Sequence, residues 1–218
     1  MHADLHRGCA KKLQEHAENL RRVHPAGRFA FLARRPIGDG QQGTWAWNDD
    51  SMTTWNKSSQ KRAEQLVVVT EDSPEARLIA AGIWARATAL RDQLPEAASA
   101  QDKLAGIEAA LAGEGSQLIL ARTILGAQGF AVLVPRETSA EVLYLAVDPD
   151  SWGRGVAGAL LSFIRGFADE MMVDLELWVI ADNERAVRTY ERAGWVASSD
   201  LKVRNASGRL ERRFRLSH

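Results

Sequence analysis

A glycine-rich turn in the second half of the chain decides the fold. It reads Val147-Asp148-Pro149-Asp150-Ser151-Trp152-Gly153-Arg154-Gly155-Val156-Ala157-Gly158. The apolar run before it predicts a strand over 140–147. The helical spacing of Val156, Leu160 and Ile164 after it predicts a helix over about 153–170. A further apolar run predicts a strand over 173–180, so these segments form a strand–helix–strand unit with parallel strands.

The turn is a candidate site for a phosphate group. The first N–H groups of a helix have no partner within the helix, and the helix dipole favours an anion there. Glycines let a phosphate approach those N–H groups closely, and Arg154 adds a positive charge. A plain tight turn is the alternative. The glycines also match the dinucleotide pattern G-x-G-x-x-G, but five residues separate Val147 from Gly153 and little chain follows.

Other segments of residues 64–218 predict an α/β domain with a mixed β-sheet flanked by helices. Ser73 before Pro74, and Ser99 with Asp102 three residues later, are typical helix starts. The apolar residues of the first of these helices include Leu78 and Leu90. The predicted order is a strand at 65–70, helices from 74 and from 99, strands over 116–124, 129–135 and 140–147, a helix, a strand, a helix over 183–193, and a two-stranded ribbon over 195–217.

Residues 1–63 are predicted to form a separate, small N-terminal α/β extension of unknown role. They carry 11 Lys and Arg against 6 Asp and Glu, whereas the remaining residues have an acidic excess, and such a change of sign often marks a module boundary. Trp45, Trp47 and Trp55 are expected there in a small satellite core or, alternatively, in the lining of an acceptor pocket. Binding of nucleic acid through this basic extension is a weaker alternative.

Composition excludes several kinds of chemistry. Cys9 is the single cysteine, and the five histidines lie at positions 2, 6, 16, 24 and 218, so Ser-His-Asp, Cys-His and His-rich zinc sites cannot be built in the main domain. No metal site is therefore expected. The polar N-terminus and the lack of a long apolar run predict a cytoplasmic protein that does not span a membrane.

A second segment, together with the turn, resembles the GNAT superfamily of acyl-CoA-dependent N-acyltransferases. The turn of that family has the form Gln/Arg-x-x-Gly-x-Gly/Ala, and here Trp152 takes the place of the Gln or Arg. The second segment reads Leu177-Trp178-Val179-x-x-x-Asn183-x-x-Ala186-x-x-x-Tyr190-x-x-x-Gly194-Trp195. The resemblance is strong over about 139–195, and the order of elements extends it more weakly over 64–217. Trp178 and Trp195 are expected in the core.

The resemblance implies a splayed sheet that binds acetyl-CoA. Strand 140–147 would separate from strand 175–180, and the pantetheine arm would pair with backbone groups of Leu145, Ala146 and Val147. The diphosphate would lie on the turn, whose contacts would be Trp152, Gly153, Arg154, Gly155, Val156 and Ala157. Asn183 would contact the pantetheine arm, although an N-cap role explains it equally well.

The resemblance also implies the catalytic groups. Tyr190 would protonate the departing thiolate, because a phenol keeps its proton at neutral pH; a core aromatic is the alternative. Glu141 matches the position of the catalytic glutamate of histone-type members and would accept the proton of the amine. A chain of water molecules could replace it. A backbone N–H near Leu145 would stabilise the oxyanion.

These expectations describe an N-acetyltransferase that acts by direct attack in a ternary complex. The alternative is a catalytically silent acyl-CoA-binding module with a role in regulation or interaction. The acceptor is an amine whose identity the sequence does not define, whether a small molecule or a protein amine. Neither a membrane nor a nucleic acid is expected as a partner, and the chain would act as a monomer or homodimer.

Overall fold

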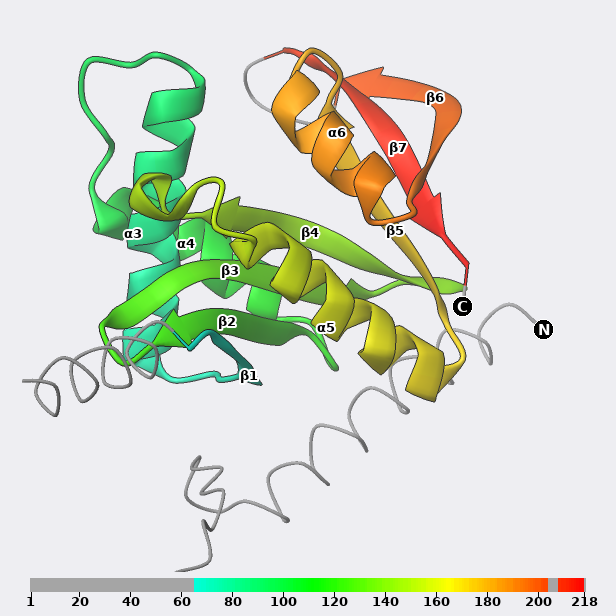
Figure 1. Cartoon of the computed structure of the whole chain (residues 1–218), viewed down its shortest axis with the longest axis horizontal. Helices are drawn as coiled ribbons and strands as arrows, with labels where there is room; N and C mark the ends of the chain where they lie inside the picture. Colours follow the sequence, from blue (N-terminus) through cyan, green and yellow to red (C-terminus); the bar gives the residue numbers. More distant parts are fainter. Residues whose placement is uncertain (1–64, 204–207, 218) are drawn as a thin grey trace, which may run out of the picture.

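The computed structural model describes residues 65–203 and 208–217, which form a seven-stranded mixed sheet with helices on both faces (Figure 1). The predicted N-terminal extension, with Trp45, Trp47 and Trp55, lies outside the described residues. The strands are β1 (Val67–Thr70), β2 (Gln117–Thr123), β3 (Gly126–Pro135), β4 (Ser139–Val147), β5 (Asp174–Ile180), β6 (Val196–Val203) and β7 (Leu210–Leu216). The helices are α3 (Pro74–Arg91), α4 (Ala100–Leu111), α5 (Val156–Met171) and α6 (Glu184–Arg192), with a short 3₁₀ turn, η1 (Pro149–Ser151).

The order of strands across the sheet is β1-β2-β3-β4-β5-β7-β6, so the predicted α/β class with a mixed sheet is confirmed. Only β4 and β5 pair in parallel, through the crossover helix α5, and all other neighbours are antiparallel. The predicted ribbon is β6 and β7, and it joins the sheet because β7 pairs with β5. Helix α5 crosses one face of the sheet, whereas α3 and α4 cover the other (Figure 1).

The sequence signals at the helix starts are confirmed, but not every apolar residue of the predicted helix α3 lies on its buried face. The Ser73 hydroxyl accepts a hydrogen bond from the Ala76 N–H at 3.1 Å, and Ser99 forms a capping box with Asp102. On α3 the buried residues are alanines and Ile83, whereas Leu78 and Leu90 are exposed. Small side chains let the helix approach the sheet and α4 closely, and this packing outweighs the hydrophobicity of the two leucines.

Helix α5 begins at Val156, three residues later than predicted, because Gly153 and Gly155 adopt left-handed backbone conformations that a helix does not contain. Its predicted apolar face is confirmed, since Val156, Leu160 and Ile164 are buried against the sheet. A Cβ atom on Gly129 of β3 would lie 2.9 Å from Val156 Cγ1. This close contact places the start of α5 over the part of β3 that pairs with Val147 at the end of β4.

Strand β4 separates from β5 halfway along its length. The two strands pair at only four positions, from Ser139 opposite Asp174 to Val142 opposite Leu177. Leu143 is the extra residue of a β-bulge, because Val142 and Tyr144 face consecutive residues of β3. A bulge bends its strand and increases the local twist. The sheet therefore opens after Val142, as the divergence of β4 and β5 in Figure 1 shows, and the expected splaying is confirmed.

None of the helices in the described ranges combines the length and apolar character that a membrane span requires.

Candidate active site

The turn after β4 presents a row of backbone N–H groups. Gly153 and Gly155 both have a φ of 80°, and the N–H of Ala159 makes the first helical bond, to the Gly155 carbonyl at 3.0 Å. The N–H groups of Val156, Ala157 and Gly158 therefore precede the helical ladder. A Cβ atom added to Gly153, Gly155 or Gly158 would meet no other atom within 4 Å. No neighbouring side chain crowds these glycines, and a row of N–H groups at a helix start fits an anion such as a diphosphate.

The open half of β4 directs two residues' backbone groups toward the gap beside β5. The N–H of Asp148 donates to the Gln128 carbonyl at 2.8 Å, which marks these two residues as a hydrogen-bonded pair with β3. Because such pairs alternate along an antiparallel ladder, the N–H and C=O of Leu145 and Val147 point away from β3. They lie beyond Val142, where β5 no longer pairs. These are the groups that the sequence assigned to the pantetheine arm.

Trp152 lies between the end of β4 and the start of α6. Its indole N–H donates to the Val147 carbonyl at 2.8 Å, and the guanidinium carbon of Arg185 lies 3.9 Å from the centre of its ring. The Val147 carbonyl, which points away from β3, is therefore already hydrogen-bonded. The backbone groups that stay available for a ligand are the N–H of Val147 and the N–H and C=O of Leu145.

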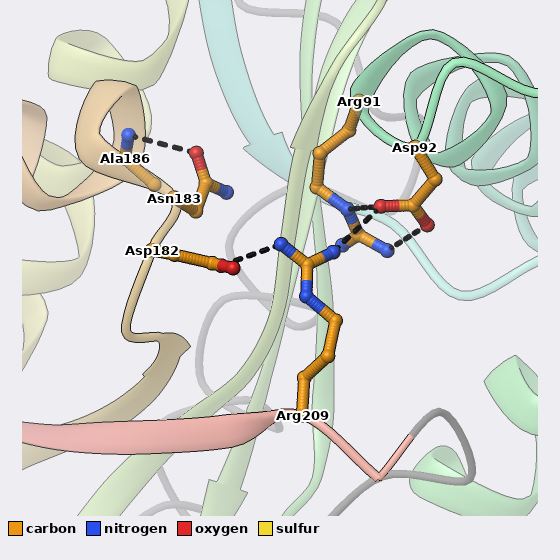
Figure 2. Close-up of polar contacts among 6 residues, drawn as sticks. All are labelled: Arg91, Asp92, Asp182, Asn183, Ala186 and Arg209. Carbon is orange, nitrogen blue, oxygen red and sulfur yellow. Dashed lines mark hydrogen bonds and ion pairs between the residues drawn. The ribbon is translucent and has the colours of Figure 1, made fainter.

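Helix α6 positions Asn183 and Tyr190 differently. Asn183 is the N-cap, and its side-chain oxygen accepts from the Ala186 N–H at 3.3 Å (Figure 2). Tyr190 is 8% exposed and packs on Trp195 and Phe214, with ring centres 6.2 and 6.0 Å away. Burial raises the pKa of Tyr190 to about 12. The phenol is therefore protonated at every physiological pH, and it lies on the face of the sheet that α5 and α6 cover.

Glu141 faces the opposite side of the sheet. Its neighbours Ala140 and Val142 belong to the core under α5, so the strand alternation directs Glu141 toward the face of α3 and α4. Its side chain is buried, and its carboxylate accepts from Nε of Arg136 at 2.6 Å. In the register of β4 and β5 it lies opposite Glu176, which pairs with Arg213. The carboxylate proposed as the base is thus held in an ion pair.

Three further aromatic side chains near these elements are Tyr144, Trp178 and Trp195. Tyr144 packs against Trp84 of α3 with ring centres 4.4 Å apart, and burial, with a smaller effect of the Glu141 charge, raises the pKa of Tyr144. Trp195 is buried as predicted, but Trp178 is only partly buried. Trp178 lies beneath the cationic groups of Lys202 and Arg213 rather than in the core, because β5 alternates and its core positions are Leu175, Leu177 and Val179.

Arg209 links the two halves of the opened sheet. Its guanidinium pairs with Asp92 at the end of α3, at 2.9 Å, and also with Asp182 in the loop between β5 and α6 (Figure 2). Arg91 pairs with the same Asp92 from within α3. The pKa of Asp92 is lowered, first by the hydrogen bond from Arg91 and then by the charges of Arg91 and Arg209. The bridge therefore connects the end of α3 with the loop between β5 and α6.

The structure brings most of the sequence-predicted residues together. Trp152, which precedes the glycine turn, contacts the end of β4 that carries Leu145 and Val147, whereas Glu141 and Tyr190 lie on opposite faces of the sheet. Sequence reasoning missed three arginines: Arg185 on Trp152, Arg136 on Glu141 and Arg209. The spacing of Arg136 and Glu141 across a tight turn, in which the Arg136 N–H donates to the Ser139 carbonyl, was a usable signal. No local pattern marks the contacts of Arg185 or Arg209.

Comparison with known proteins agrees with this geometry. Residues 101–195 match the acetyltransferase (GNAT) family. A segment of 63 residues is 46% identical to mycothiol acetyltransferase of Propionibacterium freudenreichii subsp. shermanii; it covers 28% of this chain and 20% of the relative. The chain thus spans about a fifth of the length of that curated relative.

Solved structures share the fold. The ribosomal-protein-S18-alanine N-acetyltransferase of Escherichia coli superposes with a TM-score of 0.55 at 18% identity, over 70% of this chain and 94% of that one. YncA of Salmonella typhimurium, in a structure with its cofactor acetyl-CoA, gives a TM-score of 0.52 at 17% identity over 70% and 93%. At these identities the likeness establishes the fold.

Proposed function

Because residues 101–195 belong to the acetyltransferase (GNAT) family, we propose that this chain transfers an acetyl group from acetyl-CoA to a primary amine. The observation that carries the proposal is the separation of β4 from β5 immediately beside the glycine turn. An open sheet edge and a row of helix N–H groups together fit one ligand, an extended amide-containing arm joined to a diphosphate.

The chain's own groups account for the binding of such a ligand. The N–H groups of Val156 and Ala157, with those of the glycines before them, would hold the diphosphate, and Arg154 lies beside them. The free backbone groups of Leu145 and the N–H of Val147 would pair with the amides of the arm. Asn183 retains its side-chain NH₂ for the same arm, because only its oxygen is used in the cap.

The reaction is a direct transfer. The amine nitrogen attacks the thioester carbonyl carbon, a C–N bond forms, and the C–S bond breaks with its electron pair on sulfur. The amine proton goes to Glu141 or to a water chain. The Tyr190 hydroxyl donates a hydrogen bond to the departing thiolate, which is protonated at the expense of the amine proton, and a backbone N–H near Leu145 stabilises the oxyanion. The products are an N-acetyl amide and the free thiol of CoA.

The raised pKa of Tyr190 limits what this group contributes. A thiol has a pKa near 8.5, so full transfer of a proton from a phenol with a pKa of about 12 to a thiolate is uphill. The hydroxyl stabilises the developing thiolate mainly as a hydrogen-bond donor, and complete protonation requires the proton that the amine releases.

The proposal is tested by release of free thiol from acetyl-CoA in the presence of different amines. The panel includes lysine side chains, peptides with an N-terminal alanine, aminoglycosides, polyamines and amino acids. Transfer to at least one class is expected, with a mass increase of one acetyl group on the acceptor. A chain that binds CoA but acetylates none of them would be a silent acyl-CoA-binding module. Failure to bind CoA at millimolar concentration would contradict both readings.

A further inference from the structure

Arg185 differs from the other arginines of α6 because its guanidinium lies over an aromatic ring, and it has no carboxylate partner among the described residues. Its guanidinium stacks on Trp152 at 3.9 Å. Arg188, one turn further along the same helix, pairs instead with Glu184 at 2.9 Å. Both side chains are exposed, so the stacked position of Arg185 results from a specific contact with the indole ring.

The ring that holds Arg185 is itself held in place. Trp152 directly precedes Gly153 of the glycine turn, and its indole N–H is bonded to the Val147 carbonyl at 2.8 Å. An arginine of α6 is thereby held against the residue that directly precedes the glycine turn, although 33 positions separate the two residues in the chain. The stacking leaves the N–H groups at the edge of the planar guanidinium able to donate to a second ligand.

Position 152 is also where this chain departs from its family pattern, which has Gln or Arg there. We infer that Arg185, positioned by Trp152, is a ligand of the cofactor diphosphate and supplies from α6 the polar group that the turn itself lacks. The inference rests on the proposed function, because it assigns one more contact to the same acetyl-CoA site. Arginine suits the task, because it binds phosphate oxygens with paired, charge-assisted hydrogen bonds.

The test compares dissociation constants, measured by calorimetry on the full chain, for CoA, 3′-dephospho-CoA and pantetheine. Arg185→Ala is expected to weaken CoA and 3′-dephospho-CoA by the same factor, about 10- to 100-fold, as for loss of a hydrogen bond to a charged group. Binding of pantetheine, which has no phosphate, should not change. Arg188→Ala makes the same change of charge one turn away and should bind CoA within about twofold of the wild type.

Each other outcome has a defined meaning. An unchanged affinity of R185A for CoA overturns the assignment, as does an equal loss for pantetheine. A loss for CoA that is absent for 3′-dephospho-CoA also overturns it, since Arg185 would then bind the 3′-phosphate. A wild-type chain that ignores CoA overturns the proposed function together with the assignment. Binding by the wild type with an unaffected R185A overturns the assignment alone.

The positioning role of Trp152 is tested by a double-mutant cycle. Trp152→Ala should weaken CoA binding, and the R185A change should then cost little more, because the arginine has already lost its support. Trp152→Phe keeps an aromatic ring for stacking and should restore a large part of the Arg185 contribution. Additive losses in the cycle would show that the two residues act independently. Melting temperatures of all variants identify any that fail to fold.

Discussion

Arg209 Nη1 lies 2.9 Å from Asp92 Oδ1, although the two residues are 117 positions apart in the chain. Asp92 follows α3, on the side of the sheet that holds β1 to β4, and Arg209 precedes β7, on the side that holds β5 to β7. These two sides are joined within the sheet by only four paired positions of β4 and β5. The ion pair is therefore a further connection between them, in addition to the strand pairing and to the core that both sides share under α5.

Arg209→Gln should loosen this connection without unfolding the domain. Amide hydrogen exchange in the loop 92–99 and at 181–184 is expected to rise roughly two- to fivefold, the range for a partly exposed ion pair. The control is Arg188→Gln, which breaks an exposed pair within α6 alone. Equal exchange rates in both variants and in the wild type would show that the Arg209 ion pairs do not stabilise these two loops. Because the pKa of Asp92 is lowered below 3.8, the bridge should persist at pH 5 and be lost only in stronger acid.

Tyr190→Phe should lower kcat by about 100-fold while the dissociation constant of CoA stays within about threefold, because the hydroxyl acts on the leaving thiolate rather than on the bound arm. Steady-state kinetics with calorimetry separates the two quantities. Tyr144→Phe removes the only other phenolic hydroxyl of the chain and should lower kcat much less. A normal kcat in Y190F would assign Tyr190 to the core alone.

The same tyrosine predicts a change of stability in alkali. Its pKa of about 12 in the folded protein lies above the ordinary value of 10.0, so its contribution is complete below pH 10 and declines as the pH rises toward 12. Between pH 9 and 11 the wild type should lose about 1.4 kcal/mol of unfolding free energy relative to Y190F. Urea unfolding of both proteins at several pH values measures the difference. Parallel curves would contradict the raised pKa.

Glu141→Gln distinguishes the two routes for the amine proton. If Glu141 is the base, kcat/KM should fall about 100-fold at pH 7 and recover partly near pH 10, where the acceptor amine is already neutral. If a water chain carries the proton, the loss should be small at both values. Glu137→Gln, at an exposed position four residues earlier, is the matched control. Unfolding curves are needed beside the kinetics, because the change leaves the positive charge of Arg136 without its carboxylate.

Gly155→Ala tests the turn. With a φ of 80°, an alanine there should cost about 1 kcal/mol of stability from the backbone alone, since the added Cβ meets no neighbour. The strained backbone would also displace the N–H groups proposed to hold the diphosphate, so CoA binding should weaken by tenfold or more. Gly166→Ala, at an exposed helical glycine with equal space, should instead stabilise the protein by about 0.5–1 kcal/mol and leave binding unchanged. Unchanged CoA binding in G155A would place the phosphates elsewhere.

Local signals made most of the fold predictable. The caps at Ser73 and Ser99, the apolar face of α5 and the order β4–α5–β5 were all readable, because each depends on residues a few positions apart. The exact start of α5 could not be predicted, because the helical pattern of the sequence continues through glycines that have a positive φ in the structure. The exposure of Leu78 and Leu90 could not be predicted either, because it depends on how closely α3 packs on the sheet.

The sequence by itself determined the glycine turn, the strand before it and the chemical types available to the site. Tertiary structure alone decided that β4 leaves β5 after Val142 and that Glu141 and Tyr190 face opposite sides. It also decided that Arg185 rests on Trp152 and that Arg209 reaches Asp92. The physical reason is range: caps and periodicity act within one or two helical turns, whereas these contacts exist only when distant segments pack together and set each side chain's surroundings.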